Sequence, residues 1–104
     1  MQSAVKAFID HYDLSCSAQS RYIDLTSEVG ELGKELLKAS GYGKHALQPT
    51  AAAAEEAGDC LFSLLALMNE LGIDAQQALQ NALFKYERRI CKKGTAGSEN
   101  ETQI

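Results

Sequence analysis

Two pairs of acidic residues, each at helical spacing, are the side chains of this sequence best suited to carry chemistry. Glu28 and Glu31 form the first pair, and after 24 intervening residues Glu56 and Asp59 form the second. Residues three positions apart share one face of a helix, so each pair would present two carboxylates together. If the two helices pack antiparallel, the four carboxylates can meet across the contact. Oxygen donors without His or Cys suit a hard cation, so we predict that these four residues bind Mg²⁺ or Mn²⁺.

Asp59 adjoins a strongly apolar stretch, which makes its charge costly. Between Cys60 and Met68 the only polar residue is Ser63, so this helix is predicted to be buried on most of its circumference. A carboxylate against such a stretch is unfavourable unless something neutralises it. The alternative is that the acids lie on a solvated face near a helix start, where negative charge is common. The other acidic pair favours the metal site, because like charges on both helices repel unless a cation is bound.

Length and composition indicate one helical domain. The chain has 104 residues, of which 45% are hydrophobic, with a single Pro and no Trp. We predict a domain over residues 1–93, followed by a flexible polar tail over residues 94–104. The net charge of −4 argues against nucleic acid or an anionic membrane as a partner. The three cysteines lack zinc-site spacing, and neither a signal peptide nor a membrane span is recognisable, so a cytoplasmic location is expected.

Capping residues and glycines divide the chain into four predicted helices. The first runs from near residue 3 to near residue 13, and the second from Ser17 or Ser20 to Ala39. The third follows Thr50 and ends at Gly72, and the fourth follows Asp74 and ends near residue 93. Asp74 and Gln77 have the spacing of a capping box.

The second helix carries an apolar stripe that is predicted to pack against a neighbouring helix. Its residues alternate by three and four positions, and they are Tyr22, Leu25, Val29, Leu32 and Leu36. The fold class that follows is an all-α antiparallel bundle of about four helices. Because so short a bundle would struggle to cover the apolar third helix, we expect it to assemble as a homo-oligomer.

Two groups of residues are candidates for contacts with a substrate. Tyr42 and Lys44 stand in a glycine-flanked loop after the second helix, where they could contact a base or a phosphate, although a plain surface loop is the alternative for each. Lys85, Arg88 and Arg89 form a basic face on the fourth helix. Such a face is either solvated or binds phosphate.

The two acidic pairs and their surroundings resemble the MazG-like nucleotide pyrophosphohydrolases, an all-α superfamily. The resemblance extends over roughly residues 22–93. The matching stretches are Asp24 to Glu35, which includes Lys34 as a further candidate substrate contact, Ser40 to Gly43, Asp59 to Leu67, Leu71 to Asp74, and Lys85 to Ile90.

The resemblance implies an activity and an assembly. Members form dimers or tetramers, and their acidic residues hold Mg²⁺ ions that bind a nucleoside triphosphate. Water attacks the α-phosphate, which yields a nucleoside monophosphate and pyrophosphate, a reaction suited to cleansing the nucleotide pool. The matching positions are Glu28, Glu31, Glu56 and Asp59. Glu31 or Glu35 is the candidate that orients the water.

Departures from the family pattern, at Ser27, Ser63 and Ala82, affect base specificity and phosphate contacts more than the metal site. One alternative is a non-catalytic helical interaction protein, or a nucleotide-binding protein of the same fold. A ferritin-like di-iron bundle is disfavoured, because that architecture uses Glu-x-x-His motifs and this sequence has none.

Overall fold

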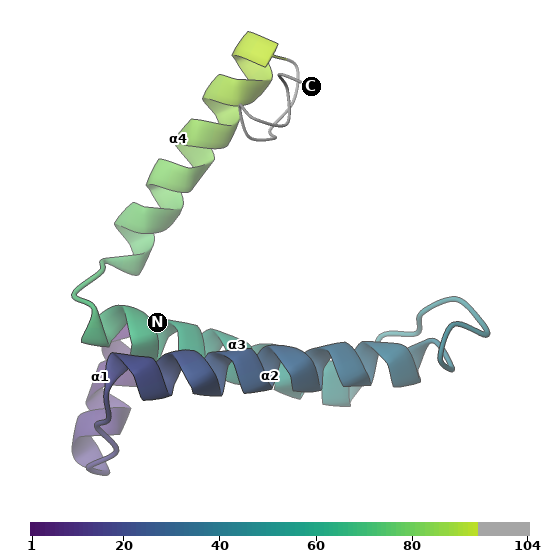
Figure 1. The fold of residues 1–104 in the computed structure, drawn as a ribbon, viewed down its shortest axis with the longest axis horizontal. Coiled ribbons are helices and arrows are strands. Elements are labelled where there is room, and N and C mark those ends of the chain that lie inside the picture. The colour runs from purple at the N-terminus through teal and green to yellow at the C-terminus, as the bar shows by residue number, and fades with distance from the viewer. Residues whose placement is uncertain (94–104) are drawn as a thin grey trace. The chain divides into compact units, whose positions relative to one another are not determined.

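Four α-helices make up residues 1–93, the part of the chain that the computed structural model describes, and this part contains no strand (Figure 1). They are α1 (Gln2–His11), α2 (Ala18–Ala39), α3 (Ala51–Glu70) and α4 (Ala75–Lys93). The all-α fold class is therefore confirmed. None of these helices is both long enough and apolar enough to cross a membrane. The predicted tail lies outside the described residues. The chain divides into two compact units, Met1–Gly72 and Ile73–Ile104.

The helices of the first unit begin at two of the predicted capping residues. The Ser17 hydroxyl accepts a hydrogen bond from the backbone N–H of Ser20 at 3.1 Å, which caps α2. The Thr50 hydroxyl accepts one from the N–H of Ala53 at 3.1 Å, which caps α3. Each hydroxyl satisfies a donor that the first turn of a helix leaves unpaired.

In the second unit, α4 begins after Asp74, whose carboxylate accepts a hydrogen bond from the N–H of Gln77 at 3.0 Å. The Gln77 side chain, which a capping box would turn back towards Asp74, donates instead to Asn81 Oδ1 at 2.9 Å. The predicted capping box is thus only half formed.

Packing of α2 against α3 builds most of the first unit, and the two helices lie side by side (Figure 1). The positions of α2 that are buried or half-buried recur at alternating steps of four and three residues, the spacing of a helix–helix contact. They are Ala18, Arg21, Leu25, Glu28, Leu32, Glu35 and Ala39. We call these residues and the α3 residues opposite them the α2–α3 interface. The chain reverses between the helices, where the N–H of Gln48 donates to Ala39 O at 3.0 Å.

This interface corrects the predicted packing stripe of α2. Leu25 and Leu32 belong to it, but Tyr22, Val29 and Leu36 are exposed. The α2 side chains that turn towards α3 lie one position before these three, and two of them are glutamates. A turn of the helix about its axis therefore brings acids inward and leaves apolar residues at the surface.

α1 contacts the other side of α3. Phe8 and Phe62 meet edge to face with ring centroids 5.9 Å apart, and the Asn69 side chain donates to Gln2 O at 3.3 Å. The predicted burial of the apolar stretch of α3 is confirmed within the first unit, since between Cys60 and Met68 every residue except Leu61 is buried or half-buried. α1 and α2 cover only part of an apolar helix.

The loop that follows α2 depends on glycine. Three successive residues have positive φ angles, 57° at Gly41, 58° at Tyr42 and 89° at Gly43. A Cβ at Gly41 would lie 2.7 Å from Nε2 of His45, closer than side-chain atoms tolerate. The loop therefore favours glycine at position 41 through its backbone conformation, whereas an added Cβ would only displace the exposed His45 ring.

We expect Gly41→Ala to lower the free energy of unfolding by about 1–3 kcal/mol, the usual cost of a strained backbone conformation. Gly30→Ala is the matched control, because Gly30 lies inside α2 and a Cβ there would meet nothing within 4 Å. It should raise the free energy of unfolding by about 0.5–1 kcal/mol, the gain of Ala over Gly in a helix. Denaturant unfolding measures both, and unchanged stability in Gly41→Ala would contradict the assignment of the loop.

Candidate metal centre

Three acidic residues from two helices converge in the first unit. Glu28 of α2 and Glu56 and Asp59 of α3 each offer a carboxylate oxygen, and these oxygens all lie within 4.8 Å of one another. We call these three residues the acidic cluster. Glu28 and Glu56 are half-buried, whereas Asp59 is exposed. Three of the four predicted ligands thus come together, although their role as ligands stays a prediction.

The pairing of α2 with α3 explains which acids converge. Glu28 is one of the α2 positions that face α3, and Glu56 is half-buried on α3 opposite it. Glu31 is three positions past Glu28, but it lies off the α2–α3 interface and is exposed. The structure does not include it in the acidic cluster, though its charge is near enough to act on Glu56.

Negative charge accumulates at this point. The pKa of the Glu56 carboxyl is raised, first by burial and then by the negative charges of Asp59, Glu28, Glu31 and Glu35. The pKa of the neighbouring Cys60 thiol is also raised, again first by burial and then by the charges of the acidic cluster. Burial is thus the first cause of both shifts, and the carboxylates at the α2–α3 interface add to each.

No ion pair within residues 1–93 reaches the acidic cluster. Carboxylates that are partly withdrawn from water and unpaired repel one another, which destabilises the fold unless a cation neutralises them. The donors at this place are carboxylate oxygens, the ligands that hard divalent cations prefer. Their mutual distances also allow them to contact a single ion. The residues present therefore fit a Mg²⁺ or Mn²⁺ site.

Glu35 lies on the α2–α3 interface and is half-buried, but it has a partner of its own. Lys38 Nζ lies 3.3 Å from Glu35 Oε1. This ion pair was not predicted from the sequence, although the two residues are three positions apart on one helix, a spacing at which opposite charges attract.

The predicted substrate contacts of the first unit lie on α2 or beyond its end. Lys34 is exposed on α2, between Glu31 and Glu35. Tyr42 and Lys44 are exposed in the loop after α2. From Glu28 to the end of α2 the helix runs about 16 Å, so this loop lies well beyond the acidic cluster.

The remaining predicted contacts belong to the second unit. On α4, Lys85 Nζ lies 4.9 Å from the centre of the Tyr86 ring, and the Arg88 guanidinium lies 6.0 Å from that of Phe84. Arg89 is half-buried on the same helix. The aromatic neighbours place two of these cations against rings of their own helix, and a contact with phosphate stays a prediction.

In chelator, Glu56→Gln should raise the melting temperature by a few degrees, because it removes a half-buried charge that its neighbours repel. Excess Mg²⁺ should then raise the melting temperature of the unaltered protein more than that of the variant. Glu55→Gln is the matched control, since Glu55 is the adjacent exposed acid and lies outside the acidic cluster. Thermal melts of the three proteins with chelator and with Mg²⁺ decide the matter. Equal responses to Mg²⁺ in all three would show that the acids form only a solvated face.

Comparison with known proteins bears on the same residues. A search of curated proteins and a search of solved structures each found no match. A family model described as the MazG nucleotide pyrophosphohydrolase domain matches residues 17–93. This range takes in α2, α3 and α4 with every predicted site residue, and it is well over half of the chain. The chain therefore belongs to the MazG nucleotide pyrophosphohydrolase family.

Proposed function

We propose that this protein is a Mg²⁺-dependent pyrophosphohydrolase that converts a nucleoside or deoxynucleoside triphosphate into the monophosphate and pyrophosphate. The observation that carries the proposal is the convergence of Glu28, Glu56 and Asp59 from two helices within a chain of this family. A role in cleansing the cytoplasmic nucleotide pool would suit such a reaction.

The acidic cluster would hold the cation, with Glu31 as a further ligand or as a neighbour that acts through its charge. Mn²⁺ would be accepted for the same reason as Mg²⁺, since both prefer oxygen donors. When bound, the cation would neutralise phosphate oxygens and lower the pKa of a water molecule. Without it, the carboxylates would repel a triphosphate, so binding of the nucleotide should depend on the cation.

Glu31 is our first candidate for orienting the attacking water. It is exposed, it lies beside the acidic cluster in sequence, and no ion pair within the described helices engages it. Its carboxylate would accept a hydrogen bond from the water as the water oxygen attacks the α-phosphorus. The bond between that phosphorus and the α–β bridging oxygen then breaks, and pyrophosphate leaves. Glu35 is the second candidate, but one of its oxygens is already engaged by Lys38.

Cationic and aromatic residues would bind the rest of the substrate. Lys34 is the candidate nearest to Glu31 along α2. The other candidates for contacts with the phosphates or the base are Tyr42, Lys44, Lys85, Arg88 and Arg89.

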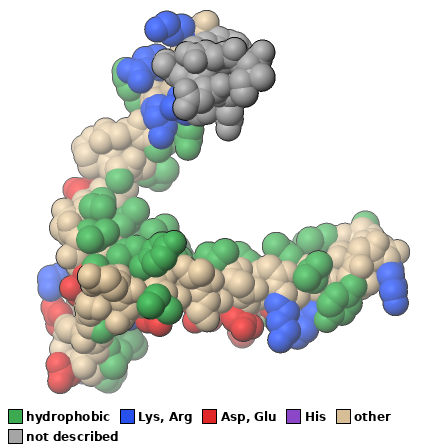
Figure 2. All heavy atoms as spheres, in the orientation of Figure 1, with side chains coloured by type: hydrophobic (Ala, Val, Ile, Leu, Met, Phe, Trp, Pro, Cys, Tyr) green, Lys and Arg blue, Asp and Glu red, His purple; other side chains and the backbone are tan. Residues whose placement is uncertain are grey.

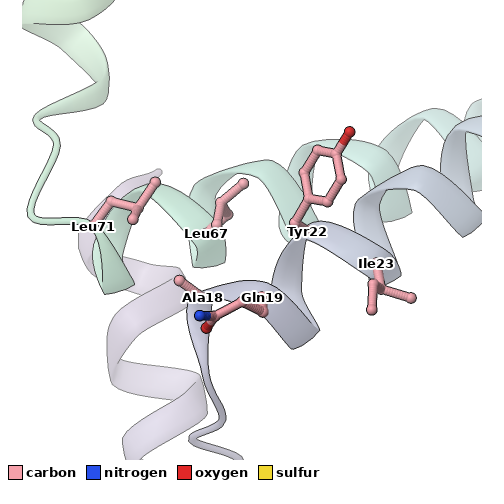
Figure 3. A pocket seen from close by; sticks show the side chains of 6 residues that line it. All are labelled: Ala18, Gln19, Tyr22, Ile23, Leu67 and Leu71. Atoms are coloured by element: carbon pink, nitrogen blue, oxygen red, sulfur yellow. The ribbon is translucent and has the colours of Figure 1, made fainter.

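Self-association is part of this proposal. An open pocket of about 480 Å³ lies between α2 and α3, and its walls are almost wholly apolar (Figure 3). The residues that line it are Ala18, Gln19, Tyr22, Ile23, Leu67 and Leu71. Figure 2 shows further hydrophobic side chains gathered along the surface of these helices. Exposed apolar side chains that gather in one region are typical of an interaction surface, and a second copy of the chain is the proposed partner.

A panel of nucleoside and deoxynucleoside triphosphates with Mg²⁺, assayed for pyrophosphate against orthophosphate, tests the reaction. We expect pyrophosphate as the first product. An analogue with a non-hydrolysable α–β bridge should bind without turnover, whereas one blocked only between the β and γ phosphates should still be cleaved. Asp59→Asn should lower kcat by orders of magnitude, because a ligand position is lost or weakened. Orthophosphate as the first product would refute the mechanism.

The same panel separates the enzyme from its alternative. A non-catalytic protein of this fold would bind a triphosphate, or none, and release neither product. Binding with no turnover of any nucleotide in the panel would favour that alternative.

Sedimentation at micromolar concentration should show at least a dimer. Ile23→Asp should shift the protein towards the monomer, since Ile23 is 67% exposed on the apolar surface and a charge there would be desolvated on association. Gln76→Asp, on an exposed polar position of α4, is the control for added charge. A clean monomer in the unaltered protein would refute self-association.

A further inference from the structure

The α2–α3 interface contains two glutamates of α2, and they differ in their charged neighbours. Glu28 and Glu35 are seven positions apart, so both turn towards α3. Glu28 belongs to the acidic cluster, and no Lys, Arg or His side chain of the described residues forms an ion pair with it. Glu35 is paired with Lys38 at 3.3 Å. One of the two inward acids is therefore neutralised by the protein itself.

The position of Glu35 follows from the contacts on either side of it. Glu28 lies at Glu56 and Asp59, and farther along α2 the Ala39 carbonyl accepts a hydrogen bond from Gln48. Because the helices run antiparallel, Glu35 lies between these points, opposite the first turns of α3. Its charge is among those that act on Glu56. Glu35 is thus a neighbour of the acidic cluster, although it is not a member.

Burial makes this ion pair more than a surface contact. The Glu35 side chain is 19% exposed, whereas the Lys38 side chain is 48% exposed, so the carboxylate is largely withdrawn from water and its partner reaches it from the surface. Water and salt screen such a pair less than a fully exposed one. Lys38 therefore neutralises the Glu35 carboxylate, which without Lys38 would be free to interact with a cation at the acidic cluster.

We propose that Lys38 is a positioning residue that keeps Glu35 out of the cation site. The ion pair limits the ligand set to the acidic cluster and its immediate neighbour Glu31. This inference rests on the proposed metal-dependent function. Under this proposal, Lys38 affects cation binding only through its ion pair with Glu35.

Loss of Lys38 should alter cation binding and turnover in opposite directions. Glu35 would add an unneutralised charge beside Glu56, so a divalent cation would bind more tightly. A cation held by an additional carboxylate has less charge left for phosphate oxygens, so kcat would fall. A residue that served only the stability of α2 would not tighten cation binding.

Calorimetric titration of Mn²⁺ into the nucleotide-free protein tests the proposal, with Lys38→Met, Lys38→Arg, Glu35→Gln and the double variant Lys38→Met/Glu35→Gln. Lys38→Met should lower the Kd about threefold to tenfold, the effect of one unit charge on a divalent ion across partly solvated space. Lys38→Arg, which keeps the positive charge, should have the same Kd as the unaltered protein. In the Glu35→Gln background, Lys38→Met should change the Kd little, because its effect passes through Glu35.

Lys34→Met is the matched control, since it removes the same charge from an exposed position of α2 without breaking an ion pair of the described residues. The proposal is overturned if Lys34→Met tightens binding as much as Lys38→Met, or if Lys38→Met has the same effect with and without Glu35. In either case the protein still binds Mn²⁺ and the proposed function stands. If the unaltered protein binds no divalent cation, the proposed metal site fails, and this inference fails with it.

Discussion

Repulsion among carboxylates held in a packed pair of helices is the constraint on which the first unit of this structure depends. Glu28, Glu56 and Asp59 are brought together by the packing of α2 against α3, the contact that builds most of the first unit. The fold cannot bury its apolar residues here without also concentrating negative charge. Such repulsion is common at functional sites, where a bound ligand of opposite charge offsets it. The packing of α2 and α3 is therefore directly linked to the proposed chemistry.

The same constraint shapes the outer surface of α2. Turning Glu28 and Glu35 towards α3 leaves Tyr22, Val29 and Leu36 on the outside, exposed in the first unit. An amphipathic helix would normally bury its apolar stripe against its neighbour. Here the acidic stripe occupies the inward position, and the apolar stripe becomes available for association. The proposed metal site and the proposed association surface would therefore both follow from one helix orientation.

Local signals predicted the helices, whereas the meeting of the two acidic stretches was predicted by assuming antiparallel packing, and the structure brings together three of the four acids. Ser17, Thr50 and Asp74 mark helix starts through their side chains, and Glu28, Glu56 and Asp59 follow from spacing. The orientation of α2 could not be predicted in this way. Its acidic and apolar stripes lie one position apart, so periodicity alone cannot decide which stripe faces α3. The ion pair of Glu35 with Lys38 was missed because its importance depends on that orientation.

Cys60 illustrates a further effect of the charge at the α2–α3 interface. Oxidants and electrophiles attack the thiolate rather than the thiol, so a cysteine with a raised pKa reacts slowly at neutral pH. The pKa of Cys60 is raised by burial and by the carboxylates beside it. At this position, burial first and the neighbouring carboxylates second favour the unreactive thiol form of Cys60, so the packing that would build a cation site also shields a sulfur atom.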